Sequence, residues 1–116
     1  MQFEINKTNI AAMISAFNKD KLAKGVRRRD AHGLDRYMGT FEAIDGEFRI
    51  NSGHLTFAVR AKVIVAGAFT MRDAVFRELL ATMRDDPMVS ITALSEGLKI
   101  NGSIISFGAD DYSYSA

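Results

Sequence analysis

With 116 residues, the chain is near the usual size of a single domain, and its 47% hydrophobic content is enough to bury a core. The absence of cysteine excludes a disulfide scaffold and cysteine catalysis, and it fits a reducing cytoplasm, where we expect the protein to act. The net charge is +1, the first residues lack the features of a signal peptide, and no apolar run could span a bilayer. We therefore expect a soluble protein with no membrane partner.

The first predicted elements are a strand and a helix. Residues 2–6 alternate apolar and polar side chains, which predicts a strand. Thr8 is predicted to cap a helix over 8–20, in which apolar residues recur at helical spacing. These apolar residues are Ile10, Met13, Ile14 and Phe17. A loop bracketed by glycines is expected over 25–33.

Three strands are predicted next, at 41–43, 48–50 and 55–60. Asp45 and Gly46 form the tight-turn signal that joins the first two. A connection over 63–67 then leads into a strand around Phe69.

The second half repeats the same kinds of element. A helix is predicted over 72–84, ended by the only proline, Pro87. Its inward residues are Val75, Phe76, Leu79, Leu80 and Met83, and its outward ones include Arg77 and Arg84. Strands follow at 89–93, 98–100 and 105–107. Residues 109–116 have no periodicity, which predicts a flexible tail.

An internal repeat of strand, helix and three strands links about 2–60 with 68–108. An offset of 66 residues places Phe3 on Phe69, Ile10 on Phe76 and Ile14 on Leu80. An offset of 50 places Phe41 on Ile91, Leu55 on Ile105 and Phe57 on Phe107. The change of offset reflects an insertion after the first helix.

The repeat predicts how the chain buries its apolar faces. One half has an amphipathic helix and a sheet with one apolar face, and it can cover neither alone. We therefore predict an α+β fold in which both helices lie together on one face of the sheets. The third strands of the two halves are expected at opposite edges, where unpaired backbone invites another chain.

The insertion concentrates positive charge. Residues 19–36 contain seven basic and three acidic side chains, whereas the rest of the chain contains eight basic and eleven acidic ones. This asymmetry favours local contact with a polyanion. The alternative is a solvated loop that keeps the protein soluble.

No residue pattern indicates an active site. Asp30, His32 and Asp35 lie close in sequence, but their spacing matches no metal motif and the basic surroundings disfavour a cation. The pairs at 85–86 and 110–111 have no nucleophile or base fixed nearby. We expect no catalysis, no metal and no cofactor.

The arrangement resembles one domain of the bacterial sliding clamp, the beta subunit of DNA polymerase III, and is most similar to its N-terminal domain. Residues 1–5 resemble that family's opening Met-Lys-Phe-x-Ile strand. Residues 43–50 look like its Asp-Gly hairpin, and residues 98–102 and 106–107 look like its last two strands. The family's Thr-Asp-Leu-Glu motif is replaced here by Gly53-His54-Leu55-Thr56.

The resemblance implies a DNA-clamp fold and a non-catalytic role as a processivity or scaffold factor. The family holds duplex DNA through its phosphates, with lysine and arginine side chains on the helices. With the basic insertion added, the matching residues here are Lys19, Lys21, Lys24, Arg27, Arg28, Arg29, Arg77 and Arg84. The implied partners are duplex DNA, further copies of the chain and replication proteins.

The resemblance also implies assembly, because a single domain cannot surround DNA. About six copies, or a partner that supplies the remaining domains, would close a ring. We predict head-to-tail pairing of the third strands, through Leu55, Phe57, Val59, Ile104 and Ser106. The alternative function is a clamp-fold protein interaction or regulatory module without DNA binding.

Overall fold

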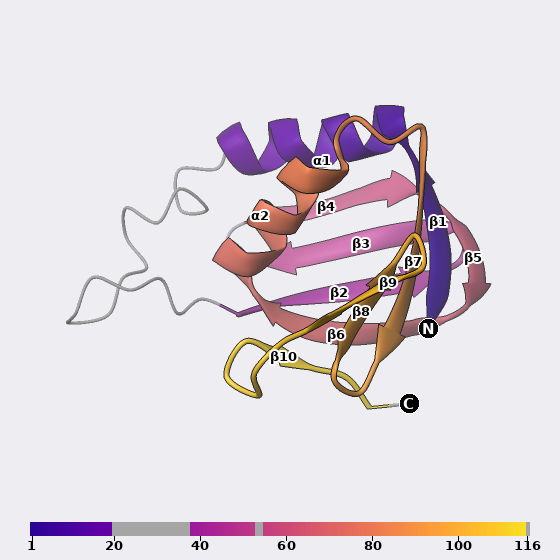
Figure 1. Ribbon diagram of the computed structural model, residues 1–116. Coiled ribbons are helices and arrows are strands. Elements are labelled where there is room, and N and C mark those ends of the chain that lie inside the picture. Colours follow the sequence, from indigo (N-terminus) through magenta and orange to yellow (C-terminus); the bar gives the residue numbers. More distant parts are fainter. Residues whose placement is uncertain (20–37, 53–54, 116) are drawn as a thin grey trace.

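In the computed structural model, residues 1–19, 38–52 and 55–115 are described, and they form an α+β fold (Figure 1). Two helices pack across two antiparallel sheets of five strands each within these residues. Helices and sheets enclose one hydrophobic core. No helix in this part of the chain is long and apolar enough to cross a membrane.

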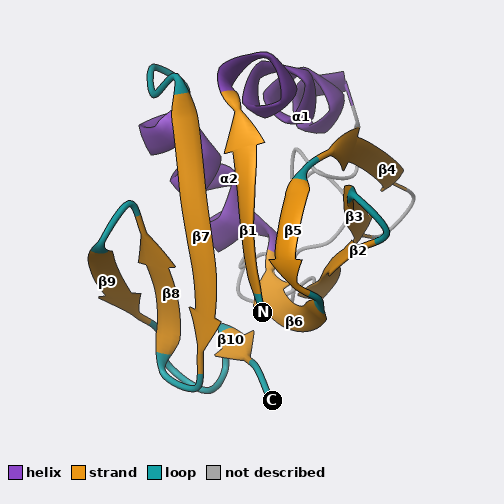
Figure 2. Ribbon diagram, turned by 90° about the vertical axis from the view of Figure 1, so that its right-hand side faces the viewer, coloured by secondary structure: helices purple, strands orange, loops and turns teal. Residues whose placement is uncertain are grey.

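The strands fall into two sheets that both mix the halves of the chain (Figure 2). The first sheet has the order β5-β1-β7-β8-β9, with the bounds Lys62–Val65, Gln2–Asn6, Met88–Leu94, Gly97–Ile100 and Ser103–Ser106. The second has the order β10-β6-β2-β3-β4, with the bounds Tyr112–Ser113, Gly67–Arg72, Met38–Ile44, Glu47–Ser52 and Leu55–Arg60. Helix α1 spans Lys7–Lys19 and helix α2 spans Asp73–Met83.

The predicted repeat is confirmed by the way the halves exchange their first strands. β1 pairs with β7 of the second half, and β6 pairs with β2 of the first half. Phe3 lies opposite Ile91, and the equivalent Phe69 lies opposite Phe41. Each half therefore completes the sheet of the other, and neither half contains a complete sheet.

The predicted alignment of the third strands is wrong by four residues. Phe48 lies opposite Val59, and its equivalent Leu98 lies opposite Ile105. Val59, not Leu55, is therefore the counterpart of Ile105, and Phe57 is not the counterpart of Phe107. The reason is that the β3–β4 hairpin is longer than the β8–β9 hairpin by two residues in each arm.

Two local predictions are also corrected. The side chain of Asn6, not that of Thr8, caps α1, since its Oδ1 accepts the backbone N–H of Asn9 at 2.9 Å. The predicted connection at 63–67 contains β5, which pairs with β1 around an irregularity beside Gln2.

The core is dominated by phenylalanine rings that join the two halves. Phe41 of the first half stacks on Phe76 of α2 with ring centroids 4.1 Å apart, and on Phe69 at 5.2 Å. Phe17 of α1 packs beside the same Phe76 ring, with the two ring centroids 6.1 Å apart. Aromatic side chains bury large apolar areas, and these rings come from both halves, so the stability of the core depends on both halves together.

The C-terminal residues are ordered against the second sheet, in contrast to the predicted frayed tail. β10 pairs with β6, and the Tyr112 side chain is only 4% exposed. Its hydroxyl donates a hydrogen bond to the backbone oxygen of Leu94 at 2.7 Å, and its ring contacts Phe69 and Phe107. Arg72 and Asp111 form an ion pair at 3.0 Å beside it. These long-range contacts hold the segment in place. Its sequence has no local periodicity from which the order could be predicted.

Burial of Tyr112 predicts a stability loss at alkaline pH. Burial raises the pKa of the Tyr112 hydroxyl from 10.0 to about 12. The unfolded chain ionises first, so this contribution to stability is complete below pH 10 and is lost as the pH rises from about 10 to about 12. Denaturant unfolding at several alkaline pH values should show a steeper loss in the parent than in Tyr112→Phe. Equal losses would contradict the assignment.

Candidate functional site

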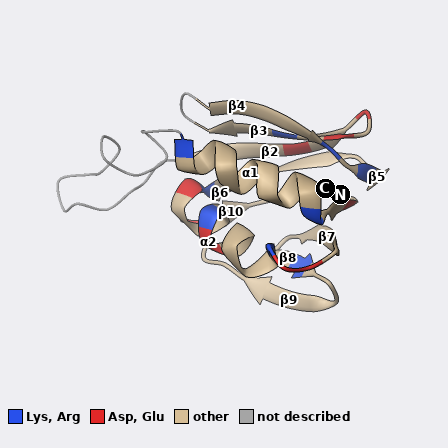
Figure 3. Cartoon of the chain, turned by 90° about the horizontal axis from the view of Figure 1, so that it is seen from above, with Lys and Arg blue, Asp and Glu red and all other residues tan. Residues whose placement is uncertain are grey.

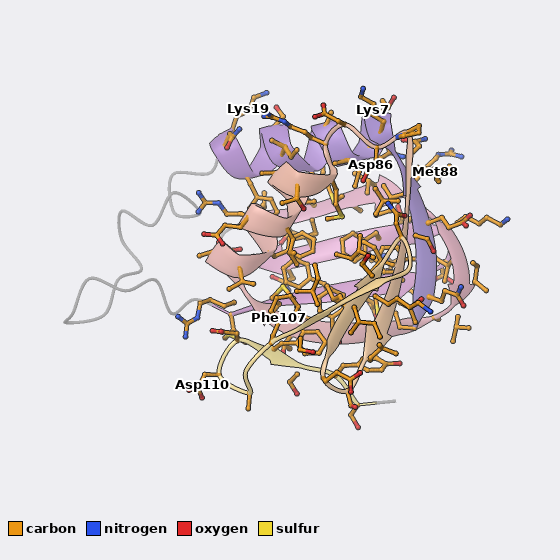
Figure 4. The ribbon with its side chains drawn as sticks, in the orientation of Figure 1. Lys7, Lys19, Asp86, Met88, Phe107 and Asp110 are labelled. Atoms are coloured by element: carbon orange, nitrogen blue, oxygen red, sulfur yellow. The ribbon has the colours of Figure 1, made fainter. Side chains whose placement is uncertain are left out.

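Three of the predicted phosphate-binding residues belong to the helix layer, which Figure 3 shows from above. Lys19 ends α1 and is exposed, as Figure 4 also shows. Arg77 is half-buried on α2, and Arg84, just past the end of that helix, is exposed. Among the described residues, these three side chains form no ion pair.

The other predicted phosphate-binding residues lie outside the described part of the chain. They are Lys21, Lys24, Arg27, Arg28 and Arg29. The described helix layer also carries the exposed acids Glu78 and Asp85. The positive charge of the described residues on this face is consequently small.

Asp73 opens α2 and is fully buried, so it adds no charge to the surface. The Ser52 hydroxyl donates a hydrogen bond to its Oδ1 at 2.5 Å. A carboxylate in the first turn of a helix is stabilised by the helix dipole. This pair links the start of α2 to the end of β3 and is a structural feature.

A groove separates α1 from the C-terminal end of α2. Its volume is about 470 Å³, and it is open to solvent. Its lining consists of Ala11, Ile14, Ser15, Asn18, Lys19, Arg84 and Asp85. Two cations therefore stand over a lining that is otherwise small, polar or aliphatic. Sequence reasoning missed this groove, although Lys19 and Arg84 were both predicted site residues.

The two predicted association strands, β4 and β9, are the outer strands of different sheets (Figure 2). On β4, the Leu55, Phe57 and Val59 side chains pack on the core, and Val59 is buried. On β9, Ile104 is 56% exposed and Ser106 is also exposed.

Backbone donors on both outer strands point away from the sheets. The Phe107 N–H donates a hydrogen bond to the backbone oxygen of Glu96 at 2.9 Å. Along an antiparallel strand, residues whose N–H faces the partner strand alternate with residues whose N–H faces away from it. The N–H groups of Ile104 and Ser106 therefore face outward. By the same reasoning, the hydrogen bond from the Ala61 N–H to the Gly46 oxygen means that the backbone N–H groups of Thr56 and Ala58 face outward. The edge of β9 can accept a further strand along its length. On β4 the outward backbone oxygen of Arg60 already accepts a hydrogen bond from Asn9 Nδ2 of α1 at 3.0 Å, so the outward groups of Thr56 and Ala58 are the ones left for a further strand.

One member of each acidic pair noted in the sequence has a structural partner. Asp111 pairs with Arg72, and Asp86 accepts a hydrogen bond from Asn101 Nδ2 at 3.3 Å. No cluster of three metal-ligating side chains occurs among the described residues, and Asp30, His32 and Asp35 lie outside them.

The fold and its two outer strands define the class of protein that this chain resembles. Within the described residues, duplicated β-α-β-β-β units exchange first strands between two sheets, which is the arrangement of a DNA-clamp domain. No protein-family model and no curated protein matches the sequence.

Solved structures of bacterial beta clamps of DNA polymerase III match this chain. The Caulobacter crescentus subunit matches 100% of this chain with a TM-score of 0.66 and 17% identity. The Helicobacter pylori clamp bound to a DNA ligase peptide matches 95% with a TM-score of 0.65 and 17% identity. The Streptococcus pyogenes subunit matches 89% with a TM-score of 0.61 and 15% identity.

The match covers only part of those proteins. This chain spans 30%, 32% and 28% of the Caulobacter, Helicobacter and Streptococcus chains, respectively. At such identities the likeness shows the fold.

Proposed function

We propose that the chain is a non-catalytic, cytoplasmic clamp-fold domain that contacts the phosphates of duplex DNA without reading its sequence. The observation that supports this most is the set of cations Lys19, Arg77 and Arg84 on the helix layer of a clamp fold, which form no ion pair with any other described residue. The basic segment 19–36 begins at the end of α1 and would add to the same contact.

Non-specific phosphate binding needs only accessible positive charge, and each phosphate neutralised releases counterions. Binding of this kind weakens steeply with salt and is nearly independent of sequence. The small positive charge of the described helix layer predicts that Arg27, Arg28 and Arg29 supply much of the affinity. If the basic segment were only a solvated loop, these three arginines would contribute nothing to the affinity for DNA.

Replacing Arg27, Arg28 and Arg29 together with alanine should weaken duplex binding equally for unrelated sequences. The slope of log K against log salt should become shallower by about one for each phosphate that the variant no longer neutralises. Fluorescence anisotropy over a range of salt concentrations measures both quantities. Lys99→Ala is the charge control, because Lys99 is exposed on β8, away from the helices. Unchanged binding in the triple variant would remove the segment from the proposal.

We further propose that copies of the chain associate by pairing β4 of one with β9 of the next. The outward donors on both strands and the exposed Ile104 support this contact. An interface between two different edges is heterologous, so it closes into a ring only if its rotation allows. Light scattering at several concentrations, with and without DNA, tests the assembly.

The second candidate function is a clamp-fold module that binds proteins and not DNA. It is favoured by the mildly acidic remainder of the chain and by the Helicobacter clamp, which was solved with a DNA ligase peptide. A strict monomer that fails to bind duplex DNA even at low salt would support this candidate. Replication proteins are the corresponding class of partner.

A further inference from the structure

We infer that the groove between α1 and α2 binds an extended acidic peptide segment that carries an apolar side chain. The inference does not depend on DNA binding. The groove has a volume of about 470 Å³, which lies within the range of ordinary ligand sites and could hold a few side chains.

The shape of the groove arises from a second stripe on α1. Ile14 and Ser15 lie three and four residues after Ala11, and Asn18 lies four and three residues after them, so all four share one side of the helix, beside its core-facing stripe. Small side chains at 11 and 15 leave the surface hollow, and the half-buried Ile14 supplies an aliphatic contact. An apolar side chain of a ligand would cover Ile14 and bury area that water now touches.

The charges select an anionic ligand. Lys19 and Arg84 line the groove without an ion-pair partner among the described residues, and Asp85 is the single acid in the lining. A carboxylate can accept two parallel hydrogen bonds from the Arg84 guanidinium. Asp85 would repel a ligand carboxylate bound next to it, so we place that carboxylate beside Lys19 and Arg84.

A peptide fits this lining better than a nucleic acid does. Phosphate contacts require cations and gain nothing from an aliphatic contact, whereas a peptide can present a carboxylate beside an apolar side chain. The peptide site stands without DNA binding, but one consequence rests on the proposed function: because Lys19 and Arg84 are also candidate phosphate ligands, peptide and DNA would compete for them. The groove would then couple protein binding to release of DNA.

The test uses the full chain and a short capped peptide that alternates glutamate and leucine. In an NMR titration, amide shifts should concentrate at 11–19 and 84–85. A peptide that alternates glutamate and glycine, and one that alternates lysine and leucine, should each bind at least about tenfold more weakly. Equal shifts with the glutamate–glycine peptide, shifts centred on β4 or β9, or no shifts would overturn the inference.

Variants separate the groove from the DNA contact. Ser15→Glu and Ile14→Ser should each weaken peptide binding about tenfold. Because Ser15 is exposed, its variant tests the groove even if Ile14→Ser fails to fold. Arg77→Ala, outside the groove, should leave peptide binding unchanged while it weakens DNA binding. If a folded Ile14→Ser variant binds DNA and peptide equally more weakly than the parent, the groove belongs to a nucleic-acid site and the inference is wrong.

Discussion

Gly97→Ala should lower the free energy of unfolding by about 3 kcal/mol or more, at the upper end of the usual cost of overpacking. A Cβ at this position would lie 1.9 Å from the backbone oxygen of Ile105 and 2.9 Å from the Cα of Ser106. Both contacts are with the backbone of β9, which cannot rotate away as a side chain would. The β8–β9 ladder must therefore separate, and Leu98 and Ile105 lose part of their packing.

Denaturant or thermal unfolding measures this effect, and a loss of about 3 kcal/mol should lower the melting temperature by roughly 10 °C. Gly108→Ala is the matched control, because a Cβ there meets nothing within 4 Å and its backbone is not in the left-handed region. We expect that variant to be as stable as the parent. A Gly97→Ala variant with parent-like stability would show that β9 does not approach β8 as closely as described.

The sequence predicted those elements that have local signals. The Asp45-Gly46 pair predicts a hairpin turn, and both residues adopt the positive φ that such a two-residue turn needs. In the structure Asn101 and Gly102 adopt positive φ in the same way, between β8 and β9. The apolar spacing of α2 identified its buried face. Each of these signals is contained within a few residues, so no tertiary information was needed.

The third strands show why register could not be predicted. Their apolar residues alternate with a period of two, and a shift of four residues preserves that alternation. The pairing of Val59 with Phe48 depends on the lengths of the hairpin arms, which the apolar pattern does not encode. The order at Tyr112 likewise depends on Phe69 and Leu94, which lie far away in the sequence.

The candidate site was predicted only in part. Lys19, Arg77 and Arg84 are charged residues on helix faces, so helical periodicity is enough to place them outward. The groove depends on where the end of α2 lies relative to Ala11 and Ser15 of α1. Small residues at these positions look like ordinary surface residues until the two helices are placed together.

Ile104→Pro should abolish self-association while leaving the fold intact. Proline removes a backbone N–H, and the N–H of Ile104 faces away from β8, so the variant loses an external donor but no bond of the sheet. Proline on an edge strand also obstructs the approach of another strand. Sedimentation at several concentrations should show assemblies in the parent and only monomers in the variant.

Ile105→Pro provides the opposite control on the same strand. Its N–H faces β8 and pairs opposite Leu98, so the substitution removes a bond of the sheet and should destabilise the fold by about 3 kcal/mol or more. The two variants differ by one position and have the same composition, so they separate an edge contact from a folding defect. Retained association in a folded Ile104→Pro variant would exclude β9 as the contact. Loss of folding in both variants would show that the outward N–H of Ile104 has been misassigned.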